Sequence, residues 1–191
     1  MPGSSLWLLP PPSHALTPLL TELIRQTSSH FNSPHLFIPH VTLTSELNPD
    51  IYGSSPQEWL DSFSFPKGQD IVIHLGQLGS EDFFFRKLYS LVQKTEAITQ
   101  LGRLAREHVQ KEGEDKDEWA KHEYMPHLSL LYSDVPKVSD DKLEVVRGLA
   151  KDLGVRLDGD GELGGWVGGR VVLVPTDNEI KDWIPIAARD L

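Results

Sequence analysis

Two short stretches share one pattern, and they constrain the fold of this chain more than any other feature of its sequence. Residues 39–43 read Pro-His-Val-Thr-Leu, and residues 126–130 read Pro-His-Leu-Ser-Leu. Polar and apolar side chains alternate in both, which predicts a β-strand with one buried face. Because alternate residues of a strand point to the same face, each histidine shares a face with the hydroxyl two positions later. We therefore expect the two strands to bring two imidazoles and two hydroxyls around one small anion.

The repeated pattern is specific enough to support a functional hypothesis. About one bare match of His-x-Ser/Thr is expected by chance in a chain with eight histidines. The preceding proline, the apolar residues at both intervening positions and the second copy lower that expectation by on the order of a thousandfold. The other six histidines lack even the bare pattern. One copy alone would favour a packed histidine on a strand, whereas two copies favour a catalytic pair.

Composition limits the class of partner. The 191 residues suffice for one sizeable core, or for two small lobes that share one. A net charge of −10 opposes the binding of long nucleic acid through its phosphates. There is no cysteine, and hence neither a disulfide framework nor a thiolate nucleophile or metal ligand. Without a signal peptide or an apolar run of roughly 20 residues, we expect a cytoplasmic monomer with no membrane span, which leaves room for peripheral association with an internal membrane such as the Golgi.

Periodicity predicts an α+β chain with two similar halves in a single domain, residues 1–191. The expected strands are 4–9, 35–45, 71–75, 81–86, 126–132, 166–174 and 183–188. The expected helices are roughly 17–29, a short one at 56–62, a long one at 88–111, and 138–153. The charged stretch 112–123 has no clear apolar face and is interpreted as a solvated loop.

With these features in place, the chain resembles the 2H phosphoesterase superfamily, which is named for two such histidine motifs. Within it, the chain looks most like the cyclic nucleotide phosphodiesterases of fungi and plants. The opening SLWLLPPP, the FFFRKLY stretch at 83–89, Tyr132 and the chain length support this resemblance. It covers nearly the whole chain, although only the two motifs are highly specific. It implies a bilobal, pseudo-twofold α+β fold with two antiparallel sheets facing a central cleft and helices packed outside.

The resemblance also implies an activity and a set of site residues. Its members open ADP-ribose 1″,2″-cyclic phosphate to ADP-ribose 1″-phosphate, and many convert nucleoside 2′,3′-cyclic phosphates to 2′-phosphates. The implied partner is thus a small cyclic-phosphate nucleotide. By motif matching, His40 and His127 take the catalytic roles, and Thr42, Ser129 and Tyr132 bind the phosphate. Trp7 and Phe84 would line the nucleotide side of the site.

The residue types suit this chemistry without a metal or a cofactor. Hydrolysis of a cyclic phosphodiester needs a base for water and an acid for the departing ribose oxygen, and histidine serves both roles near neutral pH. Hydroxyls can donate to the non-bridging oxygens, where charge accumulates. We assign His127 as the base and His40 as the acid, although the similarity of the two motifs allows the reverse.

Two other functions stay open at this point. One is a 2H enzyme that processes RNA ends or ligates tRNA halves, against which the net charge of −10 counts. The other is a non-catalytic nucleotide-binding or RNA-binding module with the same fold. Intact histidines and hydroxyls in both motifs count against that second alternative.

Overall fold

The computed structural model describes residues 3–109 and 113–191. The strands are β1 (Ser4–Leu9), β2 (Val41–Leu47), β3 (Val72–Gly79), β4 (Leu88–Val92), β5 (His127–Leu131), β6 (Gly165–Val167), β7 (Arg170–Pro175) and β8 (Ala187–Asp190). The helices are α1 (Leu16–His30), α2 (Pro56–Asp61), α3 (Glu96–Arg106), α4 (Lys116–Glu118) and α5 (Asp140–Asp152). Among the short single turns between them, Phe84–Arg86 and Ile180–Asp182 are close to the site discussed below.

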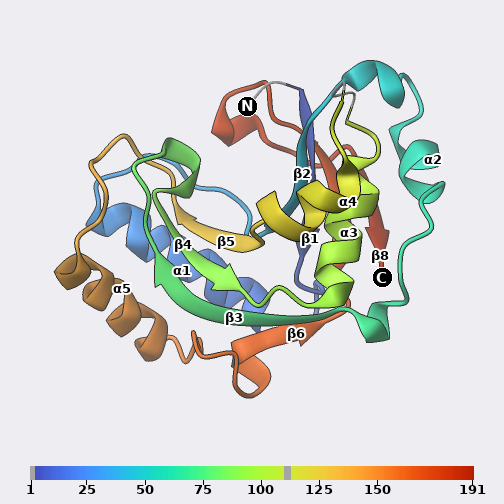
Figure 1. Cartoon of the computed structure of the whole chain (residues 1–191). Helices are drawn as coiled ribbons and strands as arrows, with labels where there is room; N and C mark the ends of the chain where they lie inside the picture. The colour runs from blue at the N-terminus through green and yellow to red at the C-terminus, as the bar shows by residue number, and fades with distance from the viewer. Residues whose placement is uncertain (1–2, 110–112) are drawn as a thin grey trace.

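All eight strands form one curled antiparallel sheet, in the order β6-β3-β4-β5-β2-β1-β7-β8. In Figure 1, β3, β4 and β5 sweep across the view whereas β1 and β2 stand nearly upright, so that the sheet closes partway into a half-barrel. The expectation of two separate sheets is therefore not confirmed, because β5 pairs directly with β2. The two motif strands lie side by side at the centre of the sheet. The expected pseudo-twofold relation between the halves stays a prediction.

Helices cover the sheet by crossing from one half to the other. α1 follows β1 but packs against β5, and α3 follows β4 but packs against β2. Figure 1 shows α1 behind the β3–β5 half and α3 beside β1 and β2. Each helix thus covers the motif strand that belongs to the other half of the chain, which ties the halves into one continuous core.

The apolar positions that define these elements in the sequence are the ones that the fold buries. In α1 the buried side chains recur at helical spacing, at Leu16, Leu20, Leu23 and Ile24. Thr95 precedes α3 as its N-cap, and its hydroxyl accepts the backbone N–H of Ile98. In the central strands the aliphatic residues that alternate with the motif side chains are fully buried: Val41, Leu43, Leu128 and Leu130. No helix in the described part of the chain is long and apolar enough to cross a membrane.

Two predicted elements between residues 81 and 111 were wrong. Residues 81–86 form a turn that includes Phe84–Arg86, and not a strand. The strand comes later, as β4, where a helix was expected to begin. Leu88, Leu91 and Val92 fit a helical period, but pairing with β5 holds this stretch extended, with Tyr89 opposite Ser129. Because sheet pairing joins residues that are distant in the sequence, the local helical spacing predicted the wrong element here. The end of the expected helix, residues 110–112, lies outside the described residues.

The C-terminal region also departs from prediction. The single strand expected at 166–174 is two strands, β6 and β7, separated at Gly168 and Gly169. Both glycines have positive φ angles, 71° and 137°, which other residues rarely adopt. The last strand was expected at 183–188 but occupies Ala187–Asp190.

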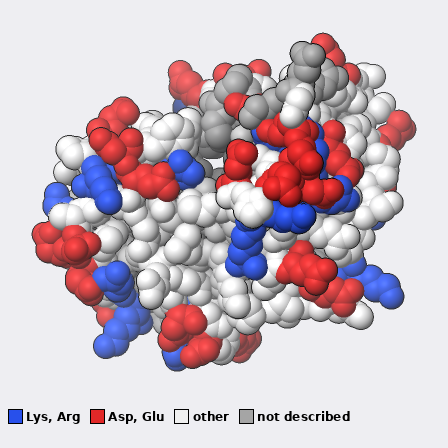
Figure 2. Space-filling view, in the orientation of Figure 1, with Lys and Arg blue, Asp and Glu red and all other residues white. Residues whose placement is uncertain are grey.

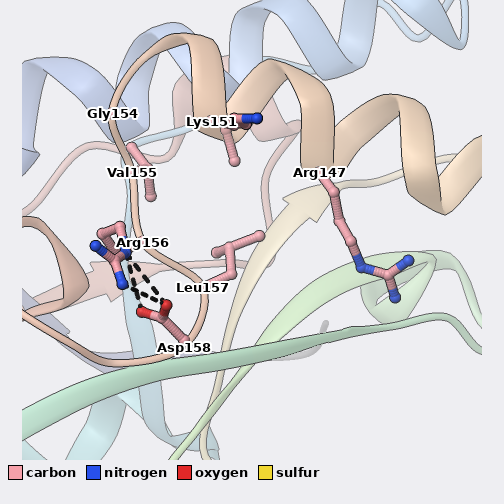
Figure 3. Close-up of a pocket in the computed structure, with 8 residues that line it drawn as sticks. Arg147, Lys151, Gly154, Val155, Arg156, Leu157 and Asp158 are labelled. Carbon is pink, nitrogen blue, oxygen red and sulfur yellow. Dashed lines mark hydrogen bonds and ion pairs between the residues drawn. The ribbon is translucent and has the colours of Figure 1, made fainter.

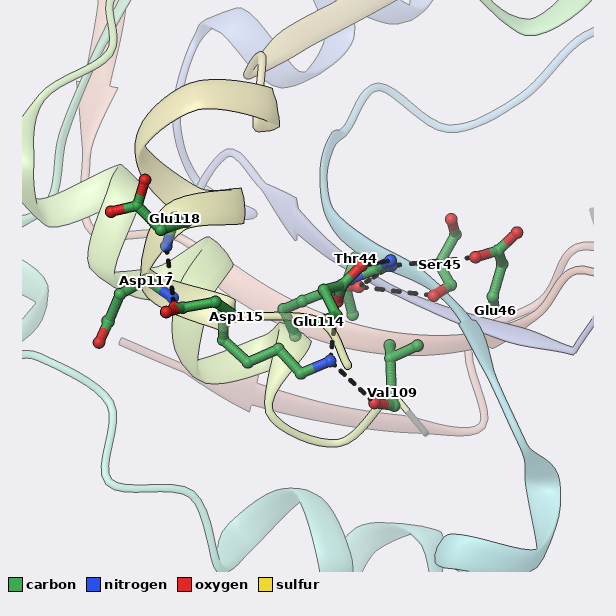
Figure 4. Close-up of polar contacts among 10 residues, drawn as sticks. Thr44, Ser45, Glu46, Val109, Glu114, Asp115, Asp117 and Glu118 are labelled. Carbon is green, nitrogen blue, oxygen red and sulfur yellow. Dashed lines mark hydrogen bonds and ion pairs between the residues drawn. The ribbon is translucent and has the colours of Figure 1, made fainter. Parts of the chain in front are cut away.

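The charged stretch after α3 is also more ordered than the solvated loop that we expected. Its described part contains α4 and a π-type turn, Trp119–Glu123, whose Ala120 is buried. Arg106 of α3 binds Glu114 through two hydrogen bonds of 2.8 Å, and the Arg106 guanidinium lies over the Trp119 ring at 4.8 Å. Figure 4 shows Glu114 within a network of polar contacts that reaches Thr44 of β2. Charged residues alone do not predict this burial, because their pairing depends on the fold.

The close approach of β6 to β3 gives a stability prediction. A methyl group at Gly165 would lie 1.8 Å from the carbonyl oxygen of Ile73 on the neighbouring strand. We expect Gly165→Ala to lower the free energy of unfolding by about 3 kcal/mol through overpacking. Gly148→Ala in α5, where nothing lies within 4 Å, should raise it by up to about 1 kcal/mol. Urea denaturation of the two variants measures both effects, and equal effects would contradict this reading.

Candidate active site

The sheet places all four motif side chains on one face. β2 and β5 pair in antiparallel register at Val41 and Leu128. One step to either side, His40 stands opposite Ser129 and Thr42 opposite His127, and opposed residues of antiparallel strands share a face. The histidines therefore meet as neighbours on adjacent strands, rather than across a gap between two sheets.

His40 is held in one tautomer by its surroundings. Its Nδ1–H donates to the backbone oxygen of Ile38 at 2.6 Å, which leaves Nε2 as an acceptor, 3.4 Å from the Tyr132 hydroxyl. The ring stacks on Trp7 with centroids 3.8 Å apart and planes at 12°. Only 2% of His40 is exposed. The arrangement presents one basic nitrogen, Nε2, in a nearly dry environment.

His127 repeats the same local geometry in the second motif. Its Nδ1–H donates at 2.8 Å to the backbone oxygen of Met125, again two residues earlier in the chain. In both motifs the intervening residue is a proline, whose fixed φ restricts the turn that brings this carbonyl to the ring. His127 is half-buried, and its ring lies 5.2 Å from that of Tyr89. Each motif thus presents an imidazole whose Nδ1 is bonded to the backbone, and at His40 the Nε2 atom has a long contact with the Tyr132 hydroxyl.

Burial makes both imidazoles weak bases. Desolvation is the main cause that lowers the pKa of His40 to about 4, and the nearby His127 lowers it further. The pKa of His127 is also lowered, mainly by burial, with the positive charge of Arg86 acting in the same direction. His40 is therefore neutral at neutral pH.

The predicted phosphate-binding residues surround the two histidines. Ser129 is buried, and its Oγ donates to the backbone oxygen of Phe85 at 3.1 Å. Thr42 is half-buried, and its backbone oxygen accepts the hydroxyl of Tyr124 at 3.1 Å. The Tyr132 ring stacks on Phe37 with centroids 3.9 Å apart. Burial raises the pKa of Tyr132, so that its hydroxyl stays protonated and able to donate.

The two residues predicted to line the nucleotide side take different positions. Trp7 is fully buried beneath His40, and its indole Nε1 has no hydrogen-bond partner among the described residues. Its position suits support of the imidazole better than an open wall. Phe84 is half-buried, with its ring 5.3 Å from His35 and 6.2 Å from Tyr132.

Sequence reasoning missed three aromatic residues that complete this cluster. Phe37 stacks on Tyr132, and Trp183 packs against Trp7 with centroids 5.7 Å apart. Phe85 lies 6.0 Å from Trp183. None belongs to a motif, and Trp183 reaches the site from the C-terminal end of the chain. The spacing of aromatic residues within the sequence carries no signal for a cluster drawn from three distant segments.

A cavity of about 620 Å³ adjoins the aromatic cluster. Phe85 and Trp183 form part of its wall, together with Ile180 and Lys181. The Trp183 indole donates to the backbone oxygen of Asn178 at 3.1 Å and so closes the loop that carries Lys181. The volume of the cavity is within the range typical of small-molecule sites.

Other charged features of the surface lie apart from the motifs. Beside α5 lies a hollow of about 460 Å³. Figure 3 shows its lining, with Arg147 and Lys151 on the helix and Arg156 bound to Asp158. It contains no motif residue. In Figure 2, acidic side chains gather over α4, where Asp117 and Glu118 are exposed. Within residues 3–109 and 113–191, no three His, Asp or Glu side chains lie together as a metal site would require.

The low pKa of His40 predicts that acid weakens the fold. An unfolded histidine takes up a proton near pH 6.5, whereas His40 in the folded protein does so only near pH 4. Between these values the unfolded state binds more protons, so stability is present above pH 6.5 and is lost as the pH falls. The loss through His40 should approach about 3 kcal/mol.

Urea denaturation at several pH values between these limits measures the effect. His40→Asn should show a flatter pH dependence than the wild type, while His30→Asn, at the exposed end of α1, should keep the wild-type slope. Identical slopes in all three proteins would contradict the burial argument.

Known proteins match this chain over its full length. Residues 1–191 match the family model described as cyclic phosphodiesterase-like protein. A protein of Phaeosphaeria nodorum named 2′,3′-cyclic-nucleotide 3′-phosphodiesterase is 52% identical over 193 residues, covering 100% of both chains. Proteins of the same name from Neurospora crassa and Yarrowia lipolytica are 43% and 28% identical, with coverage of at least 98% of each chain. The chain therefore belongs to the cyclic phosphodiesterase-like family.

Proposed function

We propose that this protein hydrolyses nucleoside 2′,3′-cyclic phosphates to 2′-phosphates, and ADP-ribose 1″,2″-cyclic phosphate to ADP-ribose 1″-phosphate, without a metal ion. The observation that carries the proposal is the pair of imidazoles on adjacent strands, His40 and His127, each with Nδ1 bonded to the backbone and Nε2 left for chemistry. The names of the full-length relatives support the cyclic-nucleotide activity.

The reaction needs one proton acceptor and one proton donor. The base removes a proton from water, whose oxygen attacks phosphorus while the bond from phosphorus to O3′ breaks. The acid gives its proton to O3′, which leaves a 2′-phosphate. Imidazoles on opposite sides of the phosphorus suit this in-line displacement. Proton exchange with water then returns the base to its neutral form and the acid to its protonated form.

The burial of His40 supports the reverse of the assignment made from the sequence. With a pKa near 4, its imidazole is neutral at neutral pH, as a base must be. His127 is more exposed, and a bound phosphate anion would raise its pKa and favour the protonated form. We therefore propose His40 as the base and His127 as the acid.

We propose that three hydroxyls stabilise the phosphorane-like transition state. Thr42, Ser129 and Tyr132 share the surroundings of the histidines, and hydroxyls in a dry site act as oriented donors. To donate to a phosphate oxygen, the Ser129 hydroxyl has to turn away from the Phe85 carbonyl. We propose that these residues bind the non-bridging oxygens.

The cavity beside Trp183 supports a nucleotide over a bare cyclic phosphate. Trp183 contacts Trp7, and Trp7 stacks on His40, so the cavity begins two rings away from the catalytic imidazole. Flat aromatic walls favour a stacked base. Phe84, on the adjoining turn, stays a proposed lining residue.

The net charge of −10 supports a small substrate over a long RNA. This weighs against the RNA end-processing alternative. The complete pair of imidazoles, with both Nε2 atoms left for chemistry, weighs against a non-catalytic module.

The catalytic roles predict the effect of removing each histidine. His40→Ala and His127→Ala should each lower kcat for 2′,3′-cyclic AMP by about 10²–10⁴-fold, because general acid–base catalysis contributes that much. His30→Ala changes a histidine on the exposed surface and should leave kcat unchanged. The assay follows 2′-AMP by chromatography, in the presence of EDTA.

Loss of wild-type activity on adding EDTA would refute metal independence, and an active His40→Ala would refute the site. A cyclic phosphate with a good leaving group separates the two roles. It should restore much of the activity of the variant that lacks the acid, which we expect to be His127→Ala, and little of that of His40→Ala.

The aromatic wall predicts a binding effect. Trp183→Leu should raise KM for 2′,3′-cyclic AMP by about tenfold, the equivalent of one stacking contact, with a small change in kcat. Trp183→Phe keeps a ring and should stay within about twofold of the wild type. A KM in Trp183→Leu equal to that of the wild type would show that the base lies elsewhere.

A further inference from the structure

Arg86 is a charged residue near the second motif that has no role in the site so far. It ends the turn Phe84–Arg86, which leads through Lys87 into β4. The preceding residue, Phe85, accepts the hydroxyl of Ser129. The turn that carries Arg86 is therefore attached directly to a motif side chain.

A chain of contacts connects Arg86 with His127. An Nη2 atom of Arg86 binds Glu81 at 2.8 Å, and the other oxygen of Glu81 accepts the Tyr89 hydroxyl at 3.1 Å. The Tyr89 ring lies 5.2 Å from the His127 ring, on the strand that pairs with β5. The guanidinium is close enough to help lower the pKa of His127, an effect that Glu81 opposes.

The guanidinium also has unused hydrogen-bonding capacity. An arginine side chain carries five N–H donors in one plane. Its Nε is buried and has no hydrogen-bond acceptor among the residues that the structure describes. A buried donor without an acceptor is costly and rare in folded proteins. The side chain as a whole is 40% exposed, so its outer Nη groups can still reach an anion bound at the second motif.

The alternative is a surface ion pair with Glu81 and nothing more. One observation weighs against it: a simple surface pair does not leave a buried Nε without an acceptor, although the guanidinium also lies over the Phe83 ring at 5.4 Å. Arginine favours phosphate because its planar donors match two oxygens at once.

We infer that Arg86 donates to a phosphate oxygen of the bound substrate beside His127, and that Glu81 orients the guanidinium. In the reaction, Arg86 offsets the charge that develops on one non-bridging oxygen, and the hydroxyls donate to the other. Its kinetic consequence rests on the proposed function, whereas its ability to bind phosphate does not.

Binding of inorganic phosphate tests the inference without turnover. Arg86→Gln should weaken phosphate binding by about 10- to 100-fold, the equivalent of one charge-assisted hydrogen bond. Glu81→Gln removes a repelling carboxylate and should bind phosphate at least as tightly as the wild type. The matched control is Arg25→Gln, since Arg25 forms a similar pair with Glu22 on the surface of α1. Isothermal titration calorimetry measures the phosphate affinity of the wild type, of these three variants and of Arg86→Lys.

A histidine titration followed by NMR gives a second, signed readout. The charged groups that act on His127 are Arg86 and Glu81, and His40 is the neighbouring titratable group. Removal of the Arg86 charge should raise the midpoint of the His127 titration, and Glu81→Gln should lower it. If Arg86 and Glu81 only supported the fold, their two variants would not shift the midpoint of the His127 titration in opposite directions.

Kinetics then connect the binding site with the reaction. On 2′,3′-cyclic AMP, Arg86→Gln should lower kcat/KM by at least as much as it weakens phosphate binding. Arg86→Lys keeps the charge and provides a variant with a milder change, which should recover part of both losses. Phosphate affinity in Arg86→Gln and Arg86→Lys equal to that of Arg25→Gln would overturn the inference. A wild type that binds phosphate through Arg86 but hydrolyses no cyclic phosphate would instead refute the proposed function.

Discussion

The hydrogen-bonded pairing of β2 with β5 at Val41 and Leu128 brings together two imidazoles that are far apart in the sequence. Its register decides which side chains face each other, since a slip of one residue would turn every motif side chain to the opposite face. The seam is short, and further contacts secure it. The Tyr124 hydroxyl reaches the Thr42 carbonyl, while the network around Arg106 and Glu114 fastens the segment before β5 to α3. Helices α1 and α3, each packed on the motif strand of the opposite half, hold the seam from outside.

Burial on the motif face creates a second constraint, which is electrostatic. Trp7 and its aromatic neighbours exclude water from His40 and keep its imidazole neutral. The same dry surroundings strengthen every hydrogen bond to a phosphate, because charges there are poorly screened. A polar site of this kind has to be complete, since each unpaired donor is expensive. Trp7 Nε1, beneath the His40 ring, and Arg86 Nε, on the turn Phe84–Arg86, are such donors among the described residues.

Much of the local structure could be predicted from periodicity, and the errors share one cause. The second motif strand, α1 and α5 follow directly from the spacing of Leu128, Leu20 and Val146, whereas the first motif strand, expected at 35–45, occupies Val41–Leu47. β4 was mistaken for a helix because Leu88, Leu91 and Val92 fit a helical period, and only its partner strand makes it extended. The charged stretch around Glu114 appeared solvated for the same reason, since the residue that buries it, Arg106, comes from another element. Trp183 carries no local signal at all.

The sequence by itself determined the candidate catalytic groups: two histidines, each followed two positions later by a hydroxyl and preceded by a proline that shapes its hydrogen bond to the backbone. These properties depend on residues within a few positions of one another, where covalent geometry and strand alternation are sufficient. Only the tertiary structure decided that the motifs lie on neighbouring strands of one sheet, that burial lowers the pKa of both histidines, and that Trp183 packs against Trp7 while Arg86 lies near His127. Pairing, desolvation and long-range charge effects arise from residues distant in the chain, and no local pattern encodes them.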